Sequence, residues 1–292
     1  MKEYYGGVVP SEDNRDFLAS NIIGSQLTTL PKSVRMITVA NNQGLSSETK
    51  VACTCYASYN VANILNEIEH HKGIAQRPDI GWRKQKEFGT HSANGDLIHT
   101  ALKSIVQNGH ITDTPKPNTS YKIDGFARVN DSELKQYLAQ GFPIITYGPV
   151  SKTNFNNAKL SGLYKPYDSN PTITHHAFAI VGYYDDVFLC MNSYGPDWGV
   201  YKDGTFEIKV SDIGNIGQKY LLYDHKDIKM IFRDVSENSP YAEAIKYCLD
   251  NGIFKGDDSD NIADPVDRFF RPSDPISRQE LALVLYRLLT KK

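Results

Sequence analysis

Three residue types that together can carry out acyl transfer occur in this chain: Cys55, His176 and Asn192. A cysteine attacks a carbonyl carbon as a thiolate, and both a helix N-terminus and a nearby imidazolium stabilise that anion. Cys55 lies where a long helical pattern begins, so the free amides of the first turn are expected to face its sulfur. His176 is a candidate proton carrier, and the amide of Asn192 is a candidate to orient it.

The elements that position these residues follow from the hydrophobic periodicity. After Cys55, apolar residues recur at helical spacing for about four turns, which predicts a central, mostly buried helix. Two further helices are predicted over about 96–108 and 131–140, each ended by a glycine. Short apolar or alternating runs then predict strands at 143–147, 177–181, 187–190 and 205–208. Helices followed by antiparallel strands indicate an α+β fold.

Short motifs surround the candidate residues in a fixed order along the chain. They are Asn42-Gln43-Gly44, Cys53-Thr54-Cys55-Tyr56-Ala57, His175-His176-Ala177, Asn192-Ser193-Tyr194-Gly195 and Asp203-Gly204-Thr205-Phe206. Together they resemble the glutamine, cysteine, histidine and asparagine segments of papain-like (C1 family) cysteine peptidases. In that family the histidine and asparagine follow the cysteine by about 130–150 residues. Asn192 falls within this range and His176 slightly before it.

The resemblance implies a two-lobed fold, a helical lobe plus an antiparallel barrel-like lobe, and an endopeptidase that works through a thioester. It assigns the nucleophile to Cys55, proton transfer to His176 and orientation of the imidazole to Asn192. The side chain of Gln43 would donate to the oxyanion. Tyr194 and Trp198 would shield the histidine–asparagine hydrogen bond, and Asn94 and Gly95 would line the path of the substrate backbone. No cofactor is implied.

Two neighbouring residues compete for the same roles. Cys53 is predicted to be a small buried residue in the turn before the helix, because only Cys55 directly precedes the aromatic–alanine pair. His175 is less favoured than His176, because the alanine follows His176 and because strand alternation points His175 away. Cys55 and His176 are therefore the predicted pair.

The chain departs from the family pattern in three places. Eleven residues, Gly44 to Thr54, separate Gln43 from Cys55, so the loop 45–50 is predicted to be an insertion. Ala52 stands where the family commonly has a disulfide cysteine, so no bridge is expected there. Residues 6–10 and 15–17 resemble the start of the mature domain in bacterial members, which implies that no long inhibitory prosegment precedes the domain.

The C-terminal residues form a second module, so the predicted domains are 1–228 and 229–292. Residues 232–280 resemble a single S-layer homology (SLH) domain, an all-α helix-loop-helix module with helices at about 241–251 and 278–290. Its apolar seam is predicted to include Ile245, Leu249, Leu281, Val284 and Leu285. The resemblance implies binding to pyruvylated cell-wall polysaccharide through Asp234, Tyr241, Gly256 and Arg278, with Arg278 as the anion contact. Such domains usually occur as three repeats. We therefore predict a homotrimer in which each of three chains supplies one copy.

Composition narrows the partners. Formal net charge is -2, with 32 basic and 34 acidic side chains, so neither nucleic acid nor an anionic membrane is expected as a partner. Four cysteines do not form a disulfide framework. No apolar run approaches the roughly 20 residues of a membrane span. The acidic loop 257–267 lacks the spacing of a calcium-binding loop, so no metal site is predicted.

Three functions remain open at this point. The favoured one is an endopeptidase acting on proteins or peptides and tethered by its SLH module. The alternatives are a degenerate binding or spacer protein, and a hydrolase of peptidoglycan cross-bridge amides. The SLH resemblance predicts a bacterial or phage protein at the cell surface or outside the cell. The start of the chain lacks the pattern of a secretory signal, so an intracellular or virion-associated protein stays open.

Overall fold

The computed structural model describes two compact units of the chain. One comprises Met1–Glu12 with Leu27–Tyr223, and the other comprises Asp13–Gln26 with Asp224–Lys292. The residues described are 7–10, 18–23, 27, 29–70, 75–88, 95–113, 115–167, 170–224, 230–232, 235–236, 242–253, 270 and 278–290. No helix in these ranges is both long enough and apolar enough to cross a membrane. All four cysteines are free thiols.

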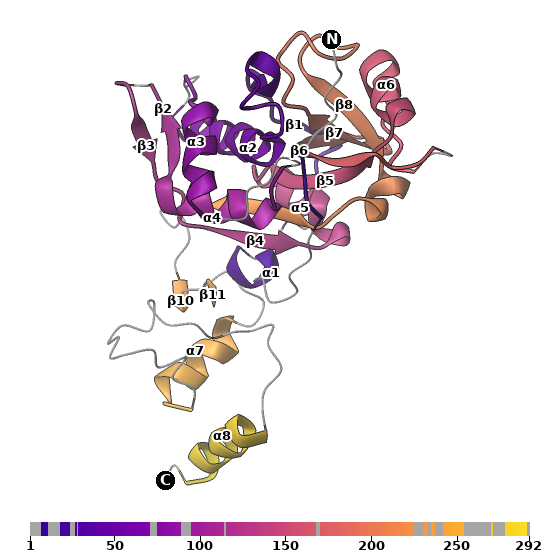
Figure 1. Cartoon of the computed structure of the whole chain (residues 1–292). Helices are drawn as coiled ribbons and strands as arrows, with labels where there is room; N and C mark the ends of the chain where they lie inside the picture. Colours follow the sequence, from indigo (N-terminus) through magenta and orange to yellow (C-terminus); the bar gives the residue numbers. More distant parts are fainter. Residues whose placement is uncertain are drawn as a thin grey trace. The chain divides into compact units, whose positions relative to one another are not determined.

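The first unit is built around one long helix, α2 (Cys53–His70). Helices α3 (Pro78–Gln85) and α4 (Ile98–Asn108) pack against it, and its other side packs on the sheet (Figure 1). The helix is buried on nearly every face because its small and apolar residues alternate with asparagines that find partners inside the protein. One of these, Asn60, accepts from the side chain of Asn41 at 2.8 Å and donates to the backbone oxygen of Asn192 at 3.1 Å.

An antiparallel sheet of seven strands forms the other half of this unit. Its order is β4-β9-β5-β6-β7-β8, and β1 pairs with the far part of β6. The strands are β1 (Ser33–Arg35), β4 (Gly125–Val129), β5 (Ile144–Val150), β6 (Thr174–Tyr184), β7 (Val187–Met191), β8 (Thr205–Lys209) and β9 (Lys219–Tyr223). Strand β6, which carries His176, is therefore held between β5 and β7 and packs against α2.

Shorter elements complete the unit. Helix α6 (Lys152–Ser161) begins with a capping box in which Ser151 and Asn154 bond each other's backbone, and it ends at Gly162 in the left-handed conformation. The remaining elements are η1 (Gln43–Leu45), η2 (Lys86–Phe88), β2 (His110–Thr112), β3 (Thr119–Tyr121), η3 (Asp131–Glu133), α5 (Leu134–Ala139) and η4 (Val210–Asn215).

The sequence-based fold is confirmed, with differences at the level of elements. All predicted helices and strands are present, but the central helix begins two residues earlier than expected, at Cys53. Helices α3 and α6 were not predicted, because each is short and mixes polar with apolar residues without a clear stripe. Strands β1, β4 and β9 were also missed, since isolated runs of three to five residues carry little periodic signal.

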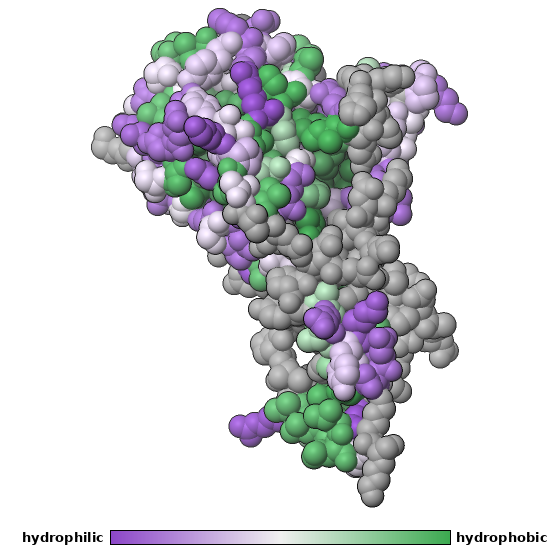
Figure 2. Space-filling model, turned by 180° about the vertical axis from the view of Figure 1, so that it is seen from behind, coloured by the Kyte–Doolittle hydropathy of each residue, from purple (hydrophilic) through white to green (hydrophobic). Residues whose placement is uncertain are grey.

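The second unit contains α1 (Ala19–Ile22), β10 (Met230–Phe232), β11 (Val235–Ser236), α7 (Ala242–Asp250) and α8 (Arg278–Thr290). Its small core joins Val235 and Ile245, with Leu249 packed against them. Leu281 and Leu285, predicted for the same core, are instead 44% and 46% exposed. Apolar side chains gather on α8, as Figure 2 shows. The exposed large apolar side chains of α8 are Leu281, Leu283, Leu285, Tyr286, Leu288 and Leu289.

Burial of two histidines in the first unit predicts that it loses stability in mild acid. Burial lowers the pKa of His110 from 6.5 to about 3 and that of His176 to about 4. The unfolded chain binds protons at these two histidines at a higher pH than the folded unit does. The contribution of their burial to the free energy of unfolding is therefore fully present above pH 6.5 and falls as the pH drops toward 4. Each group contributes up to roughly 1.4 kcal/mol per pH unit.

The variant His110→Gln should show about half of this pH dependence between pH 6.5 and 4. Tryptophan fluorescence during urea unfolding measures it, since Trp82 and Trp198 both lie in the first unit. An unchanged pH dependence in His110→Gln would contradict the assignment.

Candidate functional site

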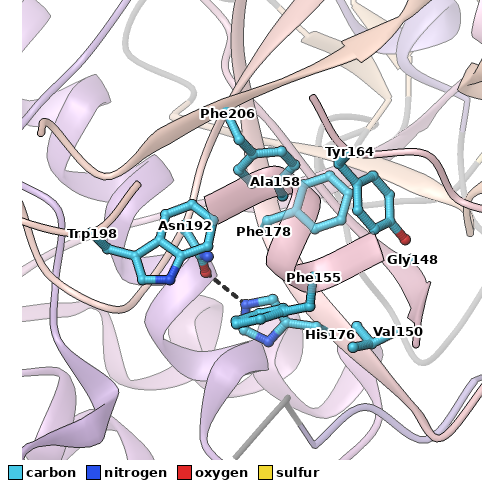
Figure 3. Close-up of a pocket in the computed structure, with 10 residues that line it drawn as sticks. All are labelled: Gly148, Val150, Phe155, Ala158, Tyr164, His176, Phe178, Asn192, Trp198 and Phe206. Atoms are coloured by element: carbon cyan, nitrogen blue, oxygen red, sulfur yellow. Dashed lines mark hydrogen bonds between the residues drawn. The ribbon is translucent and has the colours of Figure 1, made fainter. Parts of the chain in front are cut away.

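His176 and Asn192 form one hydrogen-bonded pair at the centre of the first unit. The Nε2 atom of His176 lies 2.7 Å from Oδ1 of Asn192 (Figure 3). That oxygen is an acceptor, so Nε2 carries the proton and donates it, which leaves Nδ1 as the basic nitrogen. Nδ1 is buried and has no hydrogen-bond partner among the described residues. The pair therefore presents a basic nitrogen, Nδ1, that can accept a proton, as a proton-transfer site requires.

The backbone holds Asn192 in place directly after β7. Its N–H donates to the oxygen of Gly204 at 2.8 Å, and its own backbone oxygen accepts from Asn60 on α2. Oδ1 also accepts from the N–H of Ser193 at 2.8 Å, which confirms that the oxygen, not the nitrogen, faces His176. The orientation of the imidazole thus depends on residues from the helix and from the sheet.

Aromatic side chains enclose this pair and keep water away from it. Tyr194 stacks on the ring of His176 with 5.3 Å between centroids, and Phe155 meets His176 edge-on at 6.2 Å. Trp198 contacts Phe155 at 5.7 Å and lies beside Asn192 in the pocket (Figure 3). Burial here lowers the pKa of His176 to about 4, against the raising effect of the bond to Asn192. Tyr194 and Trp198 were expected at this place; Phe155 was missed because its helix, α6, was not predicted.

The two cysteines at the start of α2 point in different directions. Adjacent helical residues are rotated by about 100°, so residues two apart face nearly opposite sides. The sulfur of Cys53 accepts from the N–H of Gly7 at 3.2 Å and is hydrogen-bonded by the backbone of Ala177, the residue after His176. The sulfur of Cys55 lies 3.5 Å from the backbone oxygen of Pro78 on α3. The structure therefore brings Cys53, not Cys55, to the strand that carries His176.

Electrostatics also separate the two thiols. Burial raises the pKa of Cys53 to about 11, and hydrogen bonds from the backbone of Ala177 and Gly7 act in the opposite direction. Burial also raises the pKa of Cys55, and the negative charges of Asp79 and Asp96 raise it further. A carboxylate beside a thiol opposes formation of the thiolate. The surroundings of Cys55 thus disfavour a nucleophile, whereas Cys53 has hydrogen-bond donors directed at its sulfur.

Gln43 is fully buried in η1, and both polar atoms of its side-chain amide are hydrogen-bonded. Oε1 accepts from the hydroxyl of Ser193 at 2.5 Å, and Nε2 donates to the backbone oxygen of Lys50 at 2.9 Å. The loop 45–50 folds back onto it, since the Thr49 hydroxyl donates to the backbone oxygen of Gln43 at 2.7 Å. This loop therefore supports Gln43, and the link to Ser193 places it beside the His176–Asn192 pair.

Other predicted positions divide between the described and undescribed residues. Gly95 is described, with a positive φ of 116° that favours glycine. Arg278 is exposed at the start of α8. Asn94, Asp234, Tyr241 and Gly256 lie outside the described residues. Within the described ranges, no three His, Cys, Asp or Glu side chains gather as a metal site.

Comparison with known proteins places this site in a family. The model of the papain family of cysteine proteases matches residues 25–221, about two thirds of the chain. The chain belongs to the papain family. It is a cysteine-type peptidase, as the sequence predicted. The model of the S-layer homology domain matches residues 231–282, which confirms the second resemblance.

Solved structures with a similar fold include several members of this family. Xylellain, a cysteine protease from Xylella fastidiosa, has a TM-score of 0.61 and 20% identity, covering 74% of this chain and 95% of its own. A Carica candamarcensis cysteine protease, in complex with E-64, has a TM-score of 0.50 and 21% identity, covering 67% and 99%. A digestive procathepsin L of Tenebrio molitor has a TM-score of 0.53 and 14% identity, covering 72% and 76%. No protein with a curated description matches the chain.

Proposed function

We propose that the papain-family domain hydrolyses internal peptide bonds of proteins or peptides through Cys53, His176 and Asn192. In this proposal Cys53 takes the role that the sequence assigned to Cys55. The observation that carries it is the position of the Cys53 sulfur, at the start of α2 and bonded by the backbone of Ala177, next to the histidine whose Nδ1 is unoccupied.

The chemistry follows from these positions. The thiol proton of Cys53 passes to Nδ1 of His176, and the thiolate adds to the carbonyl carbon of the scissile bond. The tetrahedral intermediate collapses as the carbon–nitrogen bond breaks, and His176 gives its proton to the leaving amine. Water then attacks the thioester, His176 takes its proton and returns it to the sulfur, and the carboxylic acid leaves. Atoms and protons balance over the cycle.

Two side chains support these reaction steps without forming or breaking covalent bonds. Asn192 accepts from Nε2 and so leaves Nδ1 as the nitrogen that would exchange protons with the sulfur. Gln43 has a second amide N–H besides the one bonded to Lys50. With the backbone N–H of Cys53 it forms the proposed oxyanion hole, a contact whose removal typically costs about 10²–10³ in rate.

A thiol-directed epoxide of the E-64 type tests the proposal. We expect it to abolish casein hydrolysis and to add one label, which peptide fragmentation places on Cys53. A folded protein that neither hydrolyses casein nor takes the label would instead favour the spacer alternative. Hydrolysis of purified cell wall without hydrolysis of casein would favour the cross-bridge alternative.

For the second module, we propose binding of anionic, pyruvylated cell-wall polysaccharide at the cell surface, with Asp234, Tyr241, Gly256 and Arg278 as contact positions. The SLH family match and the exposed position of Arg278 support this assignment.

We further propose that three chains associate through single SLH copies. The exposed apolar side chains of α8 support this, because large apolar side chains on a surface favour burial against a partner. Light scattering at micromolar concentration should give three times the chain mass, and a strict monomer would contradict the trimer.

A further inference from the structure

A polar hollow of the first unit lies outside the candidate site, with walls formed by β1, the far end of β6, β7 and β8. Its volume is about 490 Å³, within the usual range of ligand pockets, and it shares no residue with the pocket around His176. Tyr184, at one end of the hollow, follows His176 by eight residues on β6, which is roughly 26 Å of strand. The hollow is therefore a separate surface of the molecule.

One carboxylate in the hollow, that of Asp203, already has a cationic partner. A guanidinium nitrogen of Arg35 lies 2.7 Å from Oδ2 of Asp203. The other oxygen, Oδ1, accepts from the N–H of Thr205 at 2.9 Å and from its hydroxyl at 2.6 Å. This pair adds no net charge to the hollow, and it shows that a guanidinium group can be accommodated there.

The second carboxylate, that of Glu207, has only neutral partners. Its Oε1 atom accepts from the hydroxyl of Tyr201 at 2.6 Å and also from the hydroxyl of Tyr184. In the part of the chain that the structure describes, Oε2 has no hydrogen-bond partner and the carboxylate has no ion pair. Because the side chain is half-buried, its charge is partly removed from water without a compensating cation. The lining residues therefore carry one uncompensated negative charge.

Backbone contacts hold this carboxylate and its tyrosine partners in place without a ligand. The N–H of Glu207 donates to the oxygen of Gly162 at 2.7 Å, and its own backbone oxygen accepts from Tyr164 at 2.8 Å. A Cβ atom on Gly162 would lie 2.7 Å from the hydroxyl of Tyr201, so this ring packs on the end of α6. The bond to Glu207 raises the pKa of Tyr201 to about 12, which keeps its hydroxyl protonated at neutral pH. A site formed in advance lowers the ordering cost of binding.

We propose that this hollow binds the guanidinium group of an arginine side chain on a peptide or protein partner. A guanidinium supplies planar N–H donors for Oε2 of Glu207 and stacks on aromatic rings, and the ring of Tyr201 is 45% exposed. Lysine supplies the same charge as a compact and more strongly hydrated ammonium, so it binds more weakly. Because the hollow contains none of the proposed catalytic residues, binding there does not depend on hydrolysis.

Saturation-transfer NMR with short capped peptides tests the site in the full chain, with Cys53 and Cys55 both replaced by serine so that no peptide is cleaved. Acetyl-Gly-Arg-Gly-amide should bind with a Kd of about 1 mM. The citrulline peptide has nearly the same shape without the charge and should bind roughly 10-fold more weakly, with the lysine peptide between the two. Equal affinity for the arginine and citrulline peptides would overturn the proposal.

Two substitutions in the hollow should change the affinity in opposite directions. Glu207→Gln keeps an acceptor oxygen for the tyrosine hydroxyls but removes the charge, so it should weaken binding of the arginine peptide by roughly 10-fold. Arg35→Gln removes a like charge and leaves Asp203 open to the ligand, so it should strengthen binding by a few fold. Weaker binding in Arg35→Gln would contradict the proposed charge balance.

Glu87→Gln provides the matched control, because it makes the same change in net charge on an exposed side chain outside the hollow. Its affinity for the arginine peptide should equal that of the parent. An unchanged affinity in a folded Glu207→Gln protein would overturn the site. If Glu207→Gln failed to fold, the citrulline comparison and Arg35→Gln would still decide, since the Arg35 side chain is 58% exposed and its replacement disturbs little packing.

Discussion

Replacing Cys53 with serine is expected to lower kcat/KM by roughly 10⁴-fold or more, which is the scale of losing a catalytic nucleophile. Cys55→Ser is expected to stay within about threefold of the parent, because the serine hydroxyl can donate to the Pro78 oxygen that the thiol now contacts. The contrast arises because the two side chains leave α2 on opposite faces and only Cys53 reaches the strand of His176. Initial rates with a fluorogenic peptide measure both variants.

Both substitutions are nearly isosteric, so each protein should keep its urea midpoint close to that of the parent. This check separates a loss of chemistry from a loss of fold. The reverse result, with Cys53→Ser active and Cys55→Ser inactive although folded, would restore Cys55 as the nucleophile and would require the start of α2 to turn relative to β6.

His176→Gln is expected to lower kcat by roughly 10³- to 10⁴-fold, since it removes the group that accepts the thiol proton and returns it to the leaving amine. Its amide has no basic nitrogen to replace Nδ1. The natural control is the neighbouring histidine: His175→Gln should keep kcat within a few fold, because alternation along β6 points that ring toward Tyr147 instead. Steady-state kinetics at pH 7 compare the two.

The alkylation rate of Cys53 adds a readout that a structural role would not change. Without His176 the thiol has no local base, so its pH profile should move to higher pH, whereas His175→Gln should leave the profile in place. The backbone oxygen of His175 accepts from the N–H of Val8, and both variants keep this bond. A large loss of kcat in His175→Gln together with a normal His176→Gln enzyme would exchange the two assignments.

The sequence by itself determined the family, the α+β fold and most of the buried elements. Periodicity is a local property, so the central helix and strands β5, β6, β7 and β8 could be read directly from the chain. The motifs also identified Gln43, His176 and Asn192, which the structure brings together through Ser193 and the Asn192 side chain. Motifs of this kind can be identified from the types and the order of a few residues.

Tertiary structure decided the features that depend on direction and on distant contacts. Cys53 and Cys55 are equally compatible with a helix start, and only the packing of α2 against β6 shows which sulfur lies against the strand that carries His176. Phe155 joins the site from a helix without a clear apolar stripe. The pairing of residues 7–9 with Asp96 and His175 uses backbone groups, which every residue carries. The amino-acid sequence therefore contains no pattern that predicts such a contact.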